Sequence, residues 1–110
     1  MSFQHQKMAS GKWNKLNLME QLANVGSEVE RAIKWKEKNN LEYGRMAFER
    51  ALELLDLTIS DEKNRPRLKE ILRVRETLAD YFAADNKFAS SDNQWQKYFY
   101  SFNYAARLNC

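Results

Sequence analysis

Cysteine and histidine are almost absent from this 110-residue chain, which has one of each, Cys110 and His5. A single cysteine cannot form an internal disulfide, and it cannot assemble a cysteine metal site. The lone histidine lies near the chain start, so no histidine accompanies a serine, a cysteine or a metal-binding glutamate in the part expected to fold. We therefore expect no metal, no cofactor and no catalytic site, and the scarcity of cysteine favours a reducing compartment.

Long apolar segments are also missing. No run of the sequence approaches the roughly 20 apolar residues that a membrane-spanning helix needs, and the first residues lack the apolar core of a signal peptide. These absences predict a cytoplasmic protein without a membrane partner.

Glycine and proline are scarce as well, with three and one in the chain, while 44% of the residues are hydrophobic and 30% are charged. This composition is typical of long regular elements, and the abundant Leu, Ala, Glu, Lys and Arg favour helices. We predict an all-α fold, a bundle of four to five helices that run up and down. The length suits a single domain, expected at 13–110 after a flexible polar tail at 1–12.

Apolar side chains recur every three or four residues in the first half of the chain, as expected for helices. One stripe keeps its phase across Gly26, which predicts a single long helix, although Ser27 and Glu30 could cap a new helix there. A second helix is expected at 41–59, with Asn39 as its cap. It is apolar around most of its circumference, which is typical of a central helix.

Two further helices are expected in the second half. Pro66 suits the first position of a helix, because its missing N–H group would have no partner there, and the apolar pattern continues to about residue 84. A polar loop follows at 85–92, and Ser91 is a plausible cap for the last helix.

Charge is unevenly distributed, although the net charge is only +3. Segment 41–62 contains two basic and six acidic residues, and segment 63–76 contains six basic and two acidic residues. As neighbours in an antiparallel hairpin, the two segments would cancel much of each other's charge.

Arg75 falls within the apolar arc of its own predicted helix, among Leu68, Leu72, Leu78 and Phe82. An unpaired guanidinium group is too costly to bury, so this side chain must reach solvent, pair with a carboxylate or bind a ligand anion. We predict that it pairs with an acidic residue of the 41–59 helix.

Arg65, Lys69 and Arg73 follow one another at intervals of four, a spacing at which like charges repel on a helix. Compensation by the acidic stripe of Glu49, Glu53 and Asp56, or plain solvation, is the first interpretation. The alternative is that these three residues, with Arg75, bind the phosphates of a nucleic acid or a nucleotide.

Aromatic residues concentrate near the end of the chain, with nine of the fourteen at 81–104. Most fit the inner face of the last helix, but Tyr100 and Tyr104 fall opposite it, flanked by Lys97 and Arg107. Such a stiff amphipathic face is favoured at protein interfaces, although isolated surface tyrosines are also common.

These patterns favour a non-catalytic interaction or regulatory protein, a homodimer or a subunit of a larger assembly. The expected partner-binding residues are Tyr100, Tyr104, Lys97 and Arg107. The alternative hypothesis is phosphate binding by the basic residues between 65 and 75.

Overall fold

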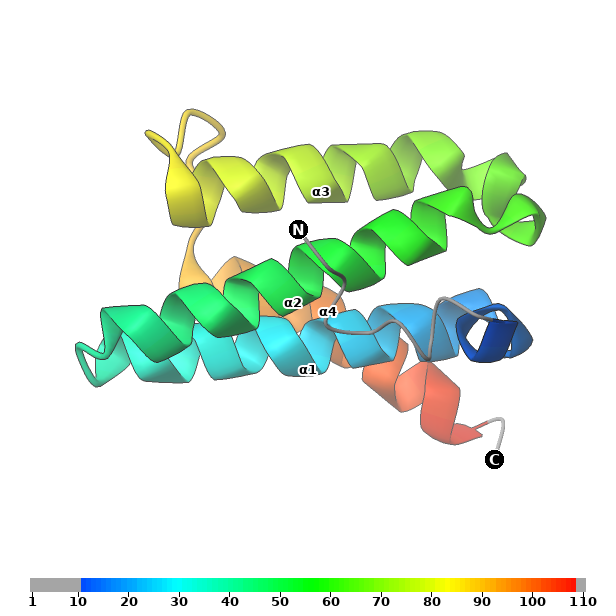
Figure 1. The fold of residues 1–110 in the computed structure, drawn as a ribbon, viewed down its shortest axis with the longest axis horizontal. Coiled ribbons are helices and arrows are strands. Elements are labelled where there is room, and N and C mark those ends of the chain that lie inside the picture. Colours follow the sequence, from blue (N-terminus) through cyan, green and yellow to red (C-terminus); the bar gives the residue numbers. More distant parts are fainter. Residues whose placement is uncertain (1–10, 109–110) are drawn as a thin grey trace.

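The computed structural model describes residues 11–108, and the tail predicted at 1–12 lies almost wholly outside this part. Within it, successive α-helices run in opposite directions and there is no strand (Figure 1). The predicted all-α up-and-down bundle is thereby confirmed. The elements are η2 (Trp13–Lys15), α1 (Leu18–Glu37), α2 (Leu41–Ser60), η3 (Glu62–Arg67), α3 (Leu68–Ala83) and α4 (Asp92–Leu108), where η denotes a 3-10 helix.

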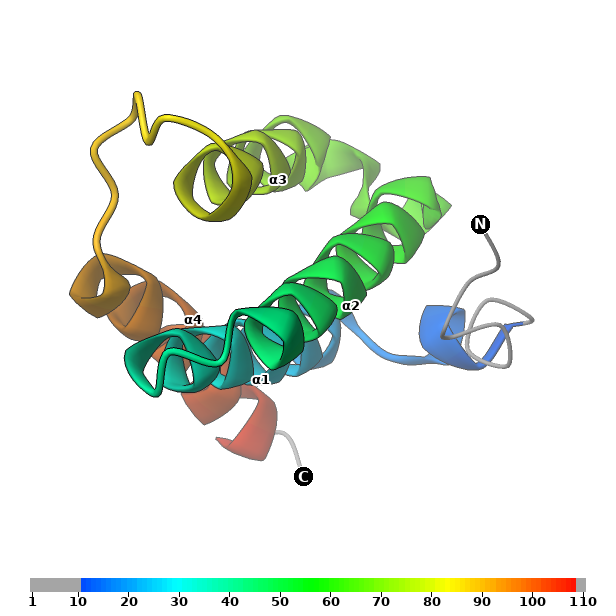
Figure 2. The same ribbon diagram turned by 60° about the vertical axis from the view of Figure 1, so that its left-hand side comes forward.

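The helices do not pack evenly around a central axis. α1 packs along both α2 and α4, whereas α3 packs mainly against α2 and stands farther from the other two (Figure 2). α2 nevertheless buries side chains around much of its circumference, including Ala47, Ala51, Leu54, Leu55 and Leu57, so its apolar sequence pattern is explained by contacts on more than one side.

α1 is one uninterrupted helix, as the phase of its apolar stripe predicts. Asn17 begins it with a capping box, in which its side chain accepts from the Glu20 backbone and Glu20 reaches back to the Asn17 backbone. The helix continues across Gly26, which lies against Phe99 of α4. This glycine therefore serves close helix packing and does not break α1.

One predicted helix cap and one predicted helix start are displaced. The cap of α2 is Asn40, whose side chain accepts from the Tyr43 backbone, while Asn39 has a positive φ of 60° that suits an asparagine just after a helix. Pro66 lies inside η3, and α3 begins two residues later at Leu68. Ser91 does cap α4, because its side chain accepts from the backbone N–H of Gln94 at 3.2 Å.

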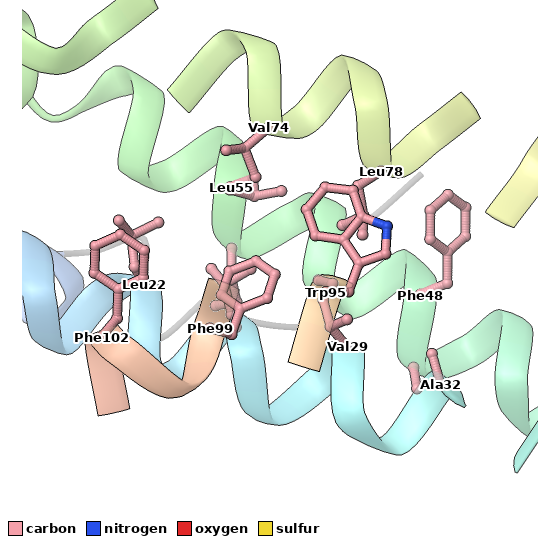
Figure 3. Close-up of a cluster of buried hydrophobic side chains, with 14 of the residues drawn as sticks. Leu22, Val29, Ala32, Phe48, Leu55, Val74, Leu78, Trp95, Phe99 and Phe102 are labelled. Atoms are coloured by element: carbon pink, nitrogen blue, oxygen red, sulfur yellow. The ribbon is translucent and has the colours of Figure 1, made fainter. Parts of the chain in front are cut away.

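The core brings α3 and α4 together through large side chains. Trp95, Phe99 and Phe102 of α4 point into the bundle, towards Val74 and Leu78 of α3 and the apolar faces of α1 and α2 (Figure 3). Each fully buried side chain of this size contributes roughly 1.5–3 kcal/mol. The aromatic side chains of α4 thus fill space that the outlying position of α3 leaves inside the bundle.

A buried polar cluster joins the two 3-10 helices to one end of the bundle. The Gln21 amide donates to the Trp13 carbonyl at 3.0 Å and to Asp61 at 2.9 Å, and the Asn64 amide donates to Gln21 at 2.8 Å. The Trp13 indole N–H donates to the Thr58 hydroxyl at 3.1 Å. Removing one partner would strand buried groups at a cost of about 1–3 kcal/mol each, so this cluster fixes where η2 and η3 lie.

Candidate protein-binding site

Three large apolar side chains stand in solvent on the outer face of α4. Tyr100, Tyr104 and Leu108 are 67%, 56% and 68% exposed, whereas Phe99 and Phe102 on the opposite face are buried. Their spacing of four places them in one stripe along the helix. We call Tyr100, Tyr104 and Leu108 the tyrosine ridge.

Two basic residues of α4 flank the ridge. Lys97 and Arg107 are both exposed, and neither has a carboxylate partner among residues 11–108. Asp92 is the only acidic residue of α4, and its carboxylate is already bound to Lys36 and Tyr81. The structure therefore places all four sequence-predicted partner-binding residues on one exposed helix, in a setting of uncompensated positive charge.

A groove between α1 and α4 adjoins the ridge, with a volume of about 460 Å³. We call it the α1–α4 groove. Gly26, Val29 and Phe99 are among the residues that line it, and Tyr100 forms part of its edge. On α1 its charged lining residues are Glu30, Arg31 and Lys34.

Two contacts fix the margins of the groove. The Gln96 amide donates to Glu30 across it at 3.4 Å, and Arg31 pairs with the buried carboxylate of Glu28 at 2.8 Å. Glu28 also pairs with Arg50 of α2 at 3.2 Å. Lys34 is exposed and has no carboxylate partner in the described part of the chain, while Glu30 at the same margin has no cationic partner there, so the groove margin carries one unpaired charge of each sign.

Arg75 does not offer its guanidinium group to a ligand. Its Nε donates to Asp56 Oδ1 at 2.6 Å, and its Nη2 donates to Asp56 Oδ2 at 3.4 Å. The predicted pairing with an acidic residue of the second helix is thereby confirmed. Arg75 is consequently removed from the four candidate anion-binding residues. Leu72, predicted to face inward beside it, is 46% exposed.

The other three candidates, Arg65, Lys69 and Arg73, are exposed and have no carboxylate partner within residues 11–108. The Arg73 guanidinium lies over the ring of Phe88, 5.3 Å from its centre. Of the two predicted alternatives for these three residues, the structure shows solvation and, among the residues that it describes, no ion pair with the acidic stripe of α2. Asp56 of that stripe meets Arg75, and Glu49 lies 3.8 Å from Arg45 of its own helix.

A cluster of three titratable side chains joins α1, α3 and α4. Lys36 Nζ donates to the Tyr81 hydroxyl at 2.9 Å and to Asp92 at 3.0 Å, and the Tyr81 hydroxyl also donates to Asp92. Burial lowers the pKa of Lys36, but these hydrogen bonds outweigh it and raise that pKa. Burial and the Asp92 carboxylate raise the pKa of Tyr81. Lys36 and Tyr81 are protonated at neutral pH and both donate to the Asp92 carboxylate, so this cluster holds the three helices together.

No group of three or more His, Cys, Asp or Glu side chains in the described part of the chain could hold a metal ion. None of the helices within residues 11–108 has the length and apolar character needed to cross a membrane. Compared with known proteins, the chain matches no family model, no curated protein and no solved structure.

Proposed function

We propose that this protein is a non-catalytic interaction module that binds an acidic amphipathic helix of another protein. The binding site is the tyrosine ridge together with the α1–α4 groove. The observation that carries the proposal is the stripe of three exposed apolar side chains beside a groove with buried aromatic and aliphatic side chains in its lining. Amphipathic helices bind such grooves through apolar anchors placed at intervals of three and four residues.

The groove can receive the apolar anchor side chains of such a helix, since it has a volume of about 460 Å³ and Val29 and Phe99 in its lining. Tyrosine is enriched at the centres of interfaces because it offers a large, stiff contact area with a polar end. Tyr100 lines the groove, and Tyr104 lies one turn further along the ridge.

Charge selects an acidic partner over a second copy of this chain. Beyond Asp92, α4 carries Lys97 and Arg107 and no acidic residue. Two copies that paired through antiparallel α4 helices would bring Lys97 of one beside Arg107 of the other, and like charges across an interface disfavour association. An acidic helix would instead neutralise these two residues and Lys34 at the groove margin.

Fluorescence anisotropy with two designed helical peptides tests the proposal. One peptide carries leucines on one face and glutamates elsewhere, and the other has every glutamate replaced by lysine. We expect the acidic peptide to bind at least about tenfold more tightly. The double variant Tyr100→Ala with Tyr104→Ala should lose this binding. The matched control, Leu41→Ala with Leu72→Ala, removes exposed apolar area elsewhere and should keep it.

Sedimentation of the same proteins shows whether a second copy of this chain, and not an acidic helix, covers the ridge. We expect the wild-type chain to sediment as a monomer when no peptide is added. If the wild type sediments as a dimer and the Tyr100→Ala with Tyr104→Ala variant as a monomer, a second copy of the chain covers the ridge. That result, or equal binding of the two peptides, would contradict an acidic partner.

A further inference from the structure

A second, shallow cleft lies between α3 and α4, away from the tyrosine ridge, and has a volume of about 320 Å³. Arg73, Val74 and Thr77 line it on α3, and Trp95 and Tyr98 are among the residues that line it on α4. Aromatic side chains and hydroxyl groups therefore share one small space. We call it the α3–α4 cleft.

Several polar groups of this cleft lack partners. The hydroxyls of Thr77 and Ser90 make no side-chain hydrogen bond within residues 11–108. Trp95 is only 6% exposed, and its indole N–H has no acceptor in the described part of the chain. Figure 3 shows this indole between the α3 and α1 ribbons. The part-exposed Thr77 and Ser90 hydroxyls are therefore open to a ligand in the cleft, whereas the Trp95 indole N–H is shielded from solvent and contributes its ring alone.

The rim of the cleft on α3 is positive. Arg73 lines the cleft, and Lys69 lies one turn before it on α3. Arg65 precedes Lys69 by four residues and lies in η3. Phe88 adds a half-exposed ring under the Arg73 guanidinium. Positive charge beside aromatic rings is the combination with which proteins bind single-stranded nucleic acids.

Tyr98 is held in a fixed position beside the cleft. Its hydroxyl donates to Glu70 at 2.9 Å, and Arg67 pairs with the same carboxylate at 2.8 Å. Its ring packs edge-on against Trp95 and Phe102. A ring anchored in this way offers a preformed surface to a flat ligand, at little cost in side-chain entropy.

We propose that the α3–α4 cleft binds a nucleotide unit. Its base enters the cleft beside Tyr98 and Trp95, and its phosphate contacts Arg73 and Lys69. A single-stranded nucleic acid and a free nucleotide share this chemistry. The site uses neither Tyr100 nor Tyr104, so it is separate from the tyrosine ridge, although Trp95 lines both this cleft and the α1–α4 groove.

The test measures fluorescence anisotropy of a labelled twelve-residue oligodeoxythymidine at salt concentrations between about 50 and 200 mM. Lys69→Ala with Arg73→Ala should weaken binding about tenfold and reduce the slope of log affinity against log salt by about 1.4, because each single-strand phosphate contact contributes about 0.7. The control Lys12→Ala with Lys15→Ala removes the same charge outside the cleft and should change binding less than about twofold.

Thr77→Leu tests the base contact separately, since it fills the cleft without changing charge. We expect about tenfold weaker binding with an unchanged salt slope, because stacking and not phosphate contact is lost. Circular dichroism checks that each variant is folded.

Competition with adenosine monophosphate distinguishes a free nucleotide from a nucleic-acid strand as the natural ligand. If adenosine monophosphate displaces the oligonucleotide, the ligand is a free nucleotide; if it does not, the ligand is a nucleic-acid strand. Absence of binding at the lowest salt concentration, an equal loss in the Lys12 and Lys15 control, or unaltered binding by Thr77→Leu would overturn the proposal.

Discussion

Gly26 is the residue on which the close contact between α1 and α4 depends most directly. A Cβ atom added at this position would lie 2.7 Å from Phe99 Cβ, closer than two non-bonded carbon atoms can approach. We expect Gly26→Ala to cost about 1–3 kcal/mol through overpacking, offset by up to about 1 kcal/mol of helix propensity. Urea denaturation should therefore show a net loss of stability of about 1–2 kcal/mol.

Gly44→Ala is the matched control for this prediction. The nearest atoms to its added Cβ would be at 3.7 Å, an ordinary contact distance, so only helix propensity changes. We expect a gain of about 0.5–1 kcal/mol. Equal effects of the two substitutions would contradict the assigned role of Gly26 in the α1–α4 contact.

The pairing of individual charged residues can be predicted from the sequence only in part. Arg75 lies in an apolar arc, and that position alone predicts a carboxylate partner, which is Asp56. Which charges of the same stretch stay unpaired could not be predicted, because the answer depends on the rotation of α3 relative to α2. Exposure of Leu72 has the same origin, since α3 turns it away from α2 and towards solvent.

At the scale of elements, the loop between α3 and α4 is organised by Asp80. Its carboxylate accepts from the backbone N–H groups of Lys87 at 2.9 Å and Phe88 at 3.1 Å, and its carbonyl accepts from Ala84 and Asn86. These contacts pull the chain back onto the end of α3. They also place Phe88 and Ser90 beside the α3–α4 cleft.

Ala89 in this loop has a positive φ of 53°. A residue other than glycine, asparagine or aspartate costs roughly 1–2 kcal/mol there. We expect Ala89→Gly to raise the free energy of unfolding by about 0.5–1 kcal/mol, after the added flexibility of the unfolded chain is subtracted. Ala84→Gly, at a φ of −135°, should lower it by about 0.4–1 kcal/mol. Thermal denaturation of both variants checks this, and a loss for Ala89→Gly would be inconsistent with strain at that position.

Long elements follow from the sequence because their patterns are local. The apolar phase across Gly26 is sufficient to predict α1 as one helix, and Ser91 is identifiable as a cap from its position alone. η3 is not predictable in the same way, because this short 3-10 helix around Pro66 is stabilised by the buried cluster of Gln21 and Asn64. Tyr100 and Tyr104 are predicted to face outward, whereas the adjoining groove requires knowledge that α4 packs against α1.

At the scale of the whole molecule, three carboxylates brace separate parts of the bundle. Asp61 joins α1 to the segment after α2, through Gln21. Glu70 joins α3 to α4 through Tyr98, and Asp92 joins α4 to α1 and α3. The backbones of α3 and α4 approach each other at few positions, so these side-chain contacts help to hold α3 to the rest of the bundle.

These braces predict how stability depends on pH. Burial raises the pKa of Asp61, Glu70 and Asp92, but hydrogen bonds from Lys63, Arg67 and Tyr81 respectively outweigh it, so each pKa is lowered from its ordinary value of 3.8 or 4.5. The unfolded chain then binds more protons than the folded chain at acid pH. The stabilisation is fully present above about pH 4.5 and is lost as the pH falls through the lowered values.

Urea denaturation between about pH 7 and pH 3 should therefore show a plateau in the free energy of unfolding at neutral pH and a steep decline below about pH 4. Asp61→Asn removes one of the three groups and keeps an oxygen that can accept from Gln21. We expect this variant to be less stable than the wild type at neutral pH, with a difference that shrinks as the pH falls, because the wild type alone loses the Asp61 charge. Parallel declines of the two proteins would contradict the role of Asp61, and a flat profile for the wild type would contradict all three braces.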